Sequence, residues 1–138
     1  MFQNYFIELD GKEVDALEGG GLSCASFVSS VLYLQNPPLA LVGQAKWLSS
    51  THANVAKNEE DMAANGWRQI DELQVGAVIT WEEKSDDGQM HLHQGFYIGD
   101  DRAVSNGSNS TLMPEEHNAT YDGTRKIIRM WWHDALND

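Results

Sequence analysis

The sequence has a single cysteine, Cys24, in 138 residues. One thiol cannot form an intrachain disulfide, and it cannot supply the several cysteine ligands of a zinc cluster. Basic residues are also scarce, since nine Lys and Arg stand against 21 Asp and Glu, which gives a net charge of −12 at pH 7. Binding to phosphate groups requires cations, so this balance argues against DNA, RNA and anionic membranes as the main partners.

Long hydrophobic runs are absent too. No stretch approaches the ~18 apolar residues that cross a bilayer, and Met1–Glu8 lacks the basic and then apolar pattern of a secretory signal. We therefore expect a protein without membrane contact, which stays in the cytoplasm or is exported by a secretion system that needs no signal peptide. The composition, with 41% hydrophobic residues and five Trp, is that of a folded protein. Its length predicts one domain over residues 1–138.

The apolar pattern after Cys24 predicts a helix. One helical face is formed by the residues three, four, seven and eight positions after Cys24, which are Phe27, Val28, Val31 and Leu32. The serines of the segment are expected to face away from this stripe: Ser26, Ser29 and Ser30. Ser23 is suited to cap the start of the helix, and Asn36-Pro37-Pro38 is suited to end it.

A second helix is expected between about Ala53 and Asn65, with Gly66 closing it. The pattern then changes to that of β-strands, which are predicted at Val75–Trp81, His93–Gly99, Arg102–Asn106 and Lys126–Trp132. Helices followed by sequential short strands, without crossover helices, predict an α+β domain whose N-terminal helices pack on an antiparallel sheet of about five strands. The acidic run Glu59-Glu60-Asp61 is expected to be solvated surface.

Cys24 is a candidate nucleophile because of its place at the start of the first predicted helix. Unpaired N–H groups and the positive end of the helix dipole there should lower the pKa of the thiol, and they can also bind an oxyanion. A thiol hydrolase needs in addition an imidazole that a third polar group orients. His93 supplies the imidazole, and Gly95 on the same strand face is expected to leave room for the Cys24 helix.

The third member of the site depends on the hairpin at Asp100-Asp101. A two-residue turn places Asn106 opposite Gly95 and beside His93, where its amide oxygen can hold the ring. A three-residue loop with a bulge shifts the register by one residue and places Ser105 there instead. Both residues are candidates, since the sequence does not decide between the two turns.

Three segments share their order and spacing with a set of known motifs. Gly21–Val28, with the sequence Gly-Leu-Ser-Cys-Ala-Ser-Phe-Val, is similar to the helix start Asp-Cys-Ser-Gly-Phe-Val. Leu73–Trp81, after Gly66-Trp67, is similar to the strand entry Leu-x-Pro-Gly-Asp-Leu-Val-Phe-Trp. His93–Gly99 is close to the strand His-Val-Gly-Ile-Tyr-Ile-Gly. These motifs belong to the NlpC/P60 cysteine peptidases, a papain-like family that the chain thus resembles.

The resemblance implies a papain-like fold in which Cys24 is the nucleophile and His93 the general base, without a cofactor. The third polar residue of the family aligns with Ser105, next to Asn106. The implied reaction is hydrolysis of an amide bond in a peptide, with the stem peptides of bacterial peptidoglycan as the substrate class. Either turnover of wall fragments or a secreted effector fits the chain, and an effector would have a basic inhibitor, or immunity protein, as its partner.

Departures from the motifs keep two other hypotheses open. Ser23 replaces the Asp before the nucleophile and Ala77 replaces the Asp of the strand entry. A catalytically silent module that binds peptides or a partner protein is therefore one alternative. The other is a metal-binding protein, because the spacing of His91 and His93 can bring both rings to one ion together with Asp86, Asp87 or His117.

Overall fold

The computed structural model describes residues 6–9, 12–15, 24–37, 46–86, 89–106 and 114–137. Over these ranges the chain is α+β, as predicted, with two helices and a six-stranded antiparallel sheet. The helices are α1 (Cys24–Leu34) and α2 (Val55–Ala64), followed near the C-terminus by a short 3-10 helix, η2 (Asp134–Leu136). No helix in the described ranges is long and apolar enough to span a membrane.

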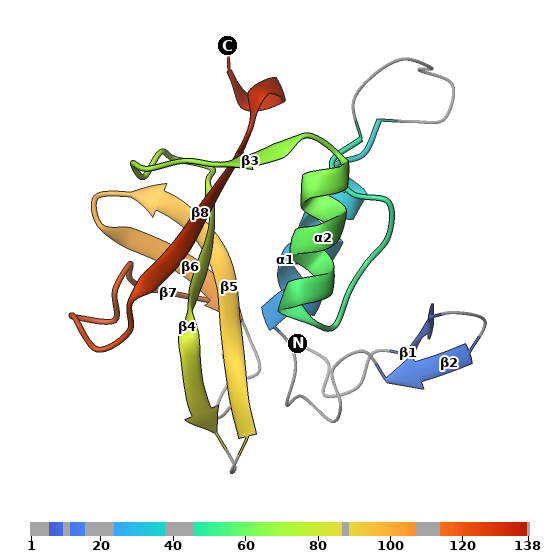
Figure 1. The fold of residues 1–138 in the computed structure, drawn as a ribbon, viewed down its shortest axis with the longest axis horizontal. Helices are drawn as coiled ribbons and strands as arrows, with labels where there is room; N and C mark the ends of the chain where they lie inside the picture. Colours follow the sequence, from blue (N-terminus) through green and yellow to red (C-terminus); the bar gives the residue numbers. More distant parts are fainter. Residues whose placement is uncertain are drawn as a thin grey trace.

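The sheet has the strand order β3-β8-β4-β5-β6-β7. Its strands are β3 (Trp67–Gln69), β4 (Val78–Asp86), β5 (Gln89–Gly99), β6 (Arg102–Asn106), β7 (Pro114–Asn118) and β8 (Ile127–His133). A separate hairpin is formed by β1 (Phe6–Leu9) and β2 (Lys12–Asp15). Figure 1 shows α1 and α2 together on one side of the sheet, next to β5.

Both predicted helices are present. Helix α1 begins at Cys24 and ends before Pro37, and α2 is capped by Asn54, whose side chain accepts a hydrogen bond from the Lys57 N–H at 3.1 Å. Gly66 follows α2 with φ of +95°, the left-handed conformation that favours glycine after a helix. Ser23, the predicted cap of α1, lies outside the described residues.

The two faces of the sheet carry separate cores. Val78 and Trp131 pack with Val28 and Leu32 of α1 and Met62 of α2. The opposite face holds a second cluster built on Ile79, Trp81, Ala103 and Ala119. Side chains alternate along a strand, so β5 directs Gln94 and Phe96 toward the helices, and it directs His93 and Gly95 toward Trp81 on the second face.

Two strands of the sheet were not predicted from the sequence, β3 and β7. Each lies at an edge of the sheet, where one side of the strand pairs with no other strand of the described residues. Strand β7 is half-buried at most, and its sequence Pro-Glu-Glu-His-Asn carries no apolar alternation. A strand that buries so little gives no periodic hydrophobic signal, although its backbone completes the ladder with β6.

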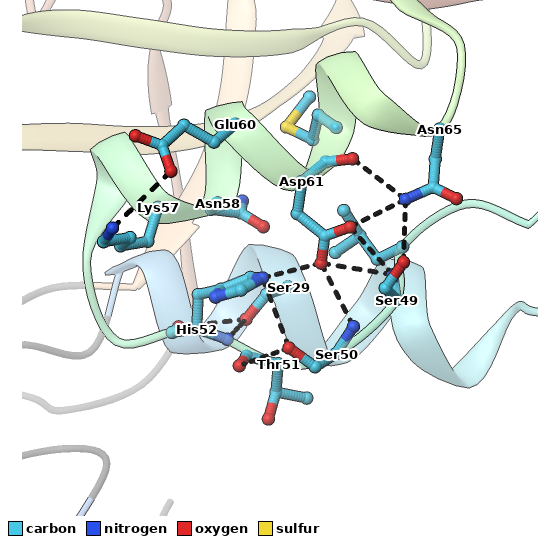
Figure 2. A network of polar contacts seen from close by, with 12 residues as sticks. Ser29, Ser49, Ser50, Thr51, His52, Lys57, Asn58, Glu60, Asp61 and Asn65 are labelled. Atoms are coloured by element: carbon cyan, nitrogen blue, oxygen red, sulfur yellow. Dashed lines mark hydrogen bonds and ion pairs between the residues drawn. The ribbon is translucent and has the colours of Figure 1, made fainter. Parts of the chain in front are cut away.

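The side chain of Asp61 holds the loop before α2 in place through hydrogen bonds, as Figure 2 shows. The carboxylate of Asp61 accepts hydrogen bonds from the backbone N–H groups of Ser49 and Ser50, and it lies 2.6 Å from His52 Nε2. Burial raises the pKa of Asp61, but these hydrogen bonds outweigh it and hold the pKa below its ordinary value. The backbone N–H of His52 donates to Ser29 Oγ at 2.8 Å, so α1 is joined to the same loop.

These contacts correct two expectations. Ser26 and Ser29 do not face solvent, because both are buried, and Ser29 bonds to the backbone of His52 in the loop before α2. Asp61 is not simply solvated surface, since it holds that loop. The surface prediction is also wrong for Glu59. Its side chain is buried and accepts four hydrogen bonds.

Candidate active site

Cys24 is the first residue of α1 and is half-buried against β5. Its Sγ lies 3.9 Å from the carbonyl oxygen of Leu92, next to His93 in sequence. The Tyr97 N–H bonds to Ala77 on the β4 side, so by alternation Leu92 directs its carbonyl toward the β6 side of the strand. The thiol therefore sits at the edge of β5, beyond the point where β6 ends.

Burial raises the pKa of the Cys24 thiol above its ordinary value of 9.0. The backbone N–H groups of Gln94 and Ala25, together with the positive charge of Arg125, act in the opposite direction but do not compensate. The start of the helix does lower the pKa of the thiol, as predicted, but burial raises it by more. The expectation that the helix start stabilises a thiolate at rest is therefore wrong. At neutral pH the site holds a protonated thiol.

His93 lies on the face of β5 opposite the helices, stacked on Trp81 with ring centroids 5.1 Å apart. Its Nε2 is 2.9 Å from Ser105 Oγ. Burial lowers the pKa of His93 to about 3, with further contributions from the charges of Arg125 and His117. The ring is therefore neutral at physiological pH and has a nitrogen lone pair to receive a proton.

The hairpin after β5 decides between the two candidates for the third member. Asp100 and Asp101 have φ of 52° and 58° and form the tight turn, so Gly99 pairs with Arg102. An irregularity between Tyr97 and Gly99 then shifts the register by one residue. The strands combine both alternatives, a two-residue turn and a bulge, and the result places Ser105 opposite Gly95.

Asn106 is thereby moved away from His93. Its side chain is fully buried, and neither its amide nitrogen nor its amide oxygen has a hydrogen-bond partner within the described part of the chain. The structure thus joins Ser105, and not Asn106, to the imidazole. The register shift is the physical reason, because neighbouring residues of a strand point to opposite faces.

Gly95 allows this approach. A Cβ at Gly95 would lie 2.5 Å from the carbonyl oxygen of Val104 and 2.8 Å from the Cβ of Ser105, with Trp81 at 3.0 Å. Only glycine lets β6 lie close enough for Ser105 to reach His93. The expectation that Gly95 leaves room for the Cys24 helix is wrong, because the atoms nearest to the added Cβ belong to β6 and to Trp81.

Sequence reasoning missed two further members of the site. Ser105 Oγ lies 2.7 Å from His117 Nε2, on β7, and 3.1 Å from the hydroxyl of Tyr121, in the turn after β7. The rings of His117 and Tyr121 are stacked with centroids 4.0 Å apart. His117 was considered only as a metal ligand, since an unrecognised edge strand could not be placed beside β6.

Arg125 places a positive charge close to the same site. Its Nε donates to the carbonyl oxygen of Glu82 and its Nη2 to that of His91, both at 3.0 Å. Two backbone acceptors on two strands hold the guanidinium in place, and its charge lowers the pKa values of both Cys24 and His93. A fixed cation here opposes protonation of His93 and favours any anion that forms at the sulfur.

A metal centre gains no support from the described residues. No three His, Cys, Asp or Glu side chains converge there. His93 already directs its Nε2 to Ser105, and His117 directs its Nε2 to the same oxygen. Asp87 and the side chain of Asp86, two of the ligands considered, lie outside the described residues.

Comparisons of the chain with protein-family models, with curated proteins and with solved structures return no match. The function has to be argued from the site itself.

Ser105→Ala is expected to lower the rate of any reaction that uses His93 by about 10- to 100-fold, because the ring loses the partner that orients it. Asn106→Ala, one residue further along β6, removes a side chain that does not contact the ring and should leave the rate within about 3-fold of wild type. Initial rates of the two variants measured side by side test this. A larger loss for Asn106→Ala than for Ser105→Ala would contradict the observed register.

The rate of Cys24 alkylation by iodoacetamide is expected to rise with pH through a midpoint above 9.0, because only the thiolate reacts and burial raises the pKa of the thiol. The urea-unfolded chain is the control, and its midpoint should be lower, at the ordinary value of 9.0. Mass spectrometry of quenched samples gives both profiles. Full reactivity of the folded protein below pH 8 would show a preformed thiolate and contradict this assignment.

Proposed function

We propose that the protein is a cysteine hydrolase that cleaves amide bonds in peptides, with Cys24 as nucleophile and His93 as general base. The observation that carries the proposal is the contact between the start of α1 and strand β5. The N-terminus of α1 places the thiol on the backbone of β5 next to His93, and Ser105 fixes the imidazole from the other side. A nucleophile at a helix start, a neutral imidazole and a group that orients it are the parts this chemistry needs.

The reaction starts from a neutral pair. The thiol proton, directed at rest to the Leu92 carbonyl, passes to His93 as Sγ attacks the substrate carbonyl carbon and the C–S bond forms. The carbonyl electrons move onto oxygen, and N–H groups at the start of α1 stabilise the oxyanion. The tetrahedral species collapses, the C–N bond breaks, and His93 returns the proton to the leaving amine. An acyl group then remains on Cys24 as a thioester.

Hydrolysis of the thioester repeats the sequence with water. His93 takes a proton from a water molecule, whose oxygen attacks the thioester carbonyl. The C–S bond breaks, the proton moves to the sulfur, and the carboxylic acid product leaves. Because the pKa of His93 is low and that of Cys24 is raised, proton transfer accompanies bond formation and does not precede it. General-base catalysis without a resting ion pair is thus part of the proposal.

The substrate class follows from the resemblance to the NlpC/P60 peptidases, which favours the stem peptides of bacterial peptidoglycan and a papain-like arrangement of the fold. The net charge of −12 gives no electrostatic attraction to an anionic cell wall, so recognition depends on contacts next to Cys24. Both settings considered for the enzyme, wall-fragment turnover and a secreted effector, are compatible with this. A basic inhibitor protein would be attracted to so acidic a surface.

Digestion of purified peptidoglycan tests the proposal. Wild type, Cys24→Ala and the control Ser30→Ala, a variant one to two turns further along α1, are incubated with the polymer, and product masses are determined. Muropeptides shortened by cleavage of an amide bond are expected from wild type and Ser30→Ala and not from Cys24→Ala. Equal product from Cys24→Ala would exclude Cys24 as the nucleophile. Product from none would remove the substrate class.

A silent binding module is the second candidate, and one observation favours it. The Cys24 thiol bonds to the Leu92 carbonyl and not to the His93 ring, and burial raises its pKa. A module of this kind would bind a muropeptide with equal affinity in wild type and His93→Gln and release no product. Calorimetric titration with a purified stem peptide, followed by mass analysis of the same sample, separates binding from turnover.

A further inference from the structure

We propose that His117 is a positioning residue that, through Ser105, sets which nitrogen of His93 carries the proton, and that protonation of His117 switches the site off at acid pH. The inference rests on the proposed function for its effect on catalysis. Its structural part concerns the proton on His93 and stands without any substrate.

The geometry is a chain of three side chains on three adjacent strands. His93 Nε2 on β5 lies 2.9 Å from Ser105 Oγ on β6, which lies 2.7 Å from His117 Nε2 on β7. The ring of His117 has its other nitrogen, Nδ1, 2.8 Å from the carbonyl oxygen of Asn118. All of these distances are those of good hydrogen bonds.

The direction of each hydrogen bond follows from the last member. A carbonyl oxygen can only accept, so Nδ1 of His117 carries a hydrogen and donates to Asn118. In the neutral ring Nε2 must then accept, and the Ser105 hydroxyl is its donor. The single hydroxyl hydrogen is thereby used, so Ser105 Oγ accepts from His93, whose Nε2 must carry its proton. Nδ1 of His93 is left with the lone pair that a general base requires.

Tyr121 completes the arrangement without changing its direction. Its hydroxyl lies 3.1 Å from Ser105 Oγ. Because the serine hydrogen is directed to His117, Tyr121 has to donate to the second lone pair of the serine oxygen. While His117 is neutral, Tyr121 therefore does not decide the proton position on His93. Its hydroxyl can also accept from Ser105, since either oxygen of this pair can be the donor, so Tyr121→Phe removes a second acceptor for the serine hydrogen.

Protonation of His117 reverses the chain. The added proton sits on Nε2, which then donates to Ser105 Oγ, and the serine hydroxyl turns its hydrogen away from His117. Two groups can receive this hydrogen, the Tyr121 hydroxyl and His93, and the proposed switch is the state in which His93 receives it. His93 can accept that hydrogen only if its Nε2 is bare, so its own proton moves to Nδ1 by exchange with solvent. The net change is one proton gained by His117. In that state Nδ1 of His93 has no lone pair and cannot take a proton from Cys24.

The groups that face His117 place this switch on the acid side of neutrality. Arg102 on β6 opposes its protonation and Glu115 on β7 favours it, while His93 on β5 and Tyr121 in the following turn are neutral at that pH. Burial is the largest influence and, with Arg102, outweighs Glu115 and the Asn118 carbonyl. The pKa of His117 therefore lies below its ordinary value of 6.5. The rate should fall as the pH drops through that lowered value.

Two variants of His117 separate the roles of acceptor and switch. His117→Leu removes the acceptor, so Ser105 is released to donate to His93. His117→Gln offers an amide oxygen as acceptor but does not titrate. Nitrogen NMR of histidine-labelled protein, with the His93 signals assigned from a His93→Gln sample, reports which nitrogen carries the proton. Tyr121→Phe is measured beside them, because in this variant the serine hydrogen can no longer turn to Tyr121.

At pH 7.5 we expect the proton on Nε2 of His93 in wild type, His117→Gln and Tyr121→Phe, and on Nδ1 in a substantial fraction of His117→Leu. Lowering the pH should move the proton to Nδ1 in wild type, at least as far in Tyr121→Phe, and not in His117→Gln. The same His93 spectrum in wild type and both His117 variants at every pH would overturn the inference, even if the hydrolase activity is found. The expected spectra without any turnover would instead contradict the proposed function alone.

Where turnover is measured, His117→Leu should lower kcat by about 10- to 100-fold with KM little changed, as is typical for a partner that orients a functional His. His117→Gln should keep a rate close to wild type and lose the acid limb of the pH profile. If His117→Leu does not fold, the pH profile of His117→Gln decides by itself, and an acid limb identical to that of wild type would overturn the switch.

Discussion

In the proposed mechanism, His93→Gln is expected to lower turnover by about 10⁴-fold or more, because without this base the Cys24 thiol stays protonated at neutral pH. Nothing else in the described site offers an equivalent lone pair. His117 uses its Nε2 to accept from Ser105 and its Nδ1 to donate to Asn118. Progress curves of muropeptide cleavage at saturating substrate measure the loss.

The matched control is His91→Gln, on the same strand and two residues earlier. His91 pairs with Lys84 of β4 and His93 pairs with Trp81, and the irregularity of β4 lies between Trp81 and Lys84. A general loss of strand stability would lower the rates of both variants together. A specific loss in His93→Gln, with a circular dichroism spectrum like that of wild type, is the expected outcome. A rate within 10-fold of wild type in His93→Gln would remove this residue from the mechanism.

The second large effect is on stability, in Glu59→Ala. The Glu59 carboxylate lies under α2 and accepts hydrogen bonds from Arg129 at 2.7 and 2.8 Å, from Trp131 Nε1 at 2.7 Å and from Thr80 Oγ1 at 3.0 Å. Its removal leaves the half-buried guanidinium of Arg129 and the buried indole N–H of Trp131 without their acceptor. The free energy of unfolding should fall by about 3–5 kcal/mol, the usual cost of breaking a buried ion pair on one side.

Urea denaturation followed by tryptophan fluorescence measures this change. Glu60→Ala is the control on the next position of α2, where the carboxylate is exposed and lies 3.6 Å from Lys57. An exposed pair of this kind contributes less than about 1 kcal/mol. Glu59→Gln should fall between the two, since it keeps one acceptor and the side-chain volume but loses the charge. Equal unfolding free energies for Glu59→Ala and Glu60→Ala would contradict the assignment of Glu59 to the core.

The elements next to the site could be predicted because each has its own periodic signal. Helix α1 shows the apolar stripe of Val28 and Leu32, and β5 and β6 are short apolar runs separated by a turn of two Asp residues. The position of Cys24 at the helix start and of His93 on a strand beside it follows from those signals. The local sequence pattern therefore sufficed to predict that Cys24 begins a helix and that His93 lies on a strand.

The orienting group could not be predicted, because it depends on one residue of register. A bulge between Tyr97 and Gly99 has no sequence signature of its own, yet it exchanges Ser105 and Asn106 between the two faces of β6. The contact of His117 with Ser105 could not be predicted for a related reason. It lies on an edge strand without apolar alternation, so no pattern indicates that β7 pairs with β6.

Electrostatic predictions failed where burial outweighs local charge. The helix start does favour a Cys24 thiolate, but its effect is smaller than that of removing the sulfur from water. Glu59 was assigned to the surface because acidic runs are usually solvated, and its partner Arg129 is 70 positions away in the chain. Both outcomes depend on tertiary packing that composition and spacing do not contain.

The central claim is that Cys24 and His93 act as nucleophile and base, and trapping of the acyl group tests it most directly. The protein is mixed with a p-nitrophenyl ester, quenched in acid within seconds, and analysed by intact mass and by peptide mapping. The account predicts one acyl group on Cys24 in wild type, and none on this residue in His93→Gln or Cys24→Ala at the same time point. An acyl group on Cys24 that forms equally fast in His93→Gln, or none on Cys24 in wild type, would contradict it.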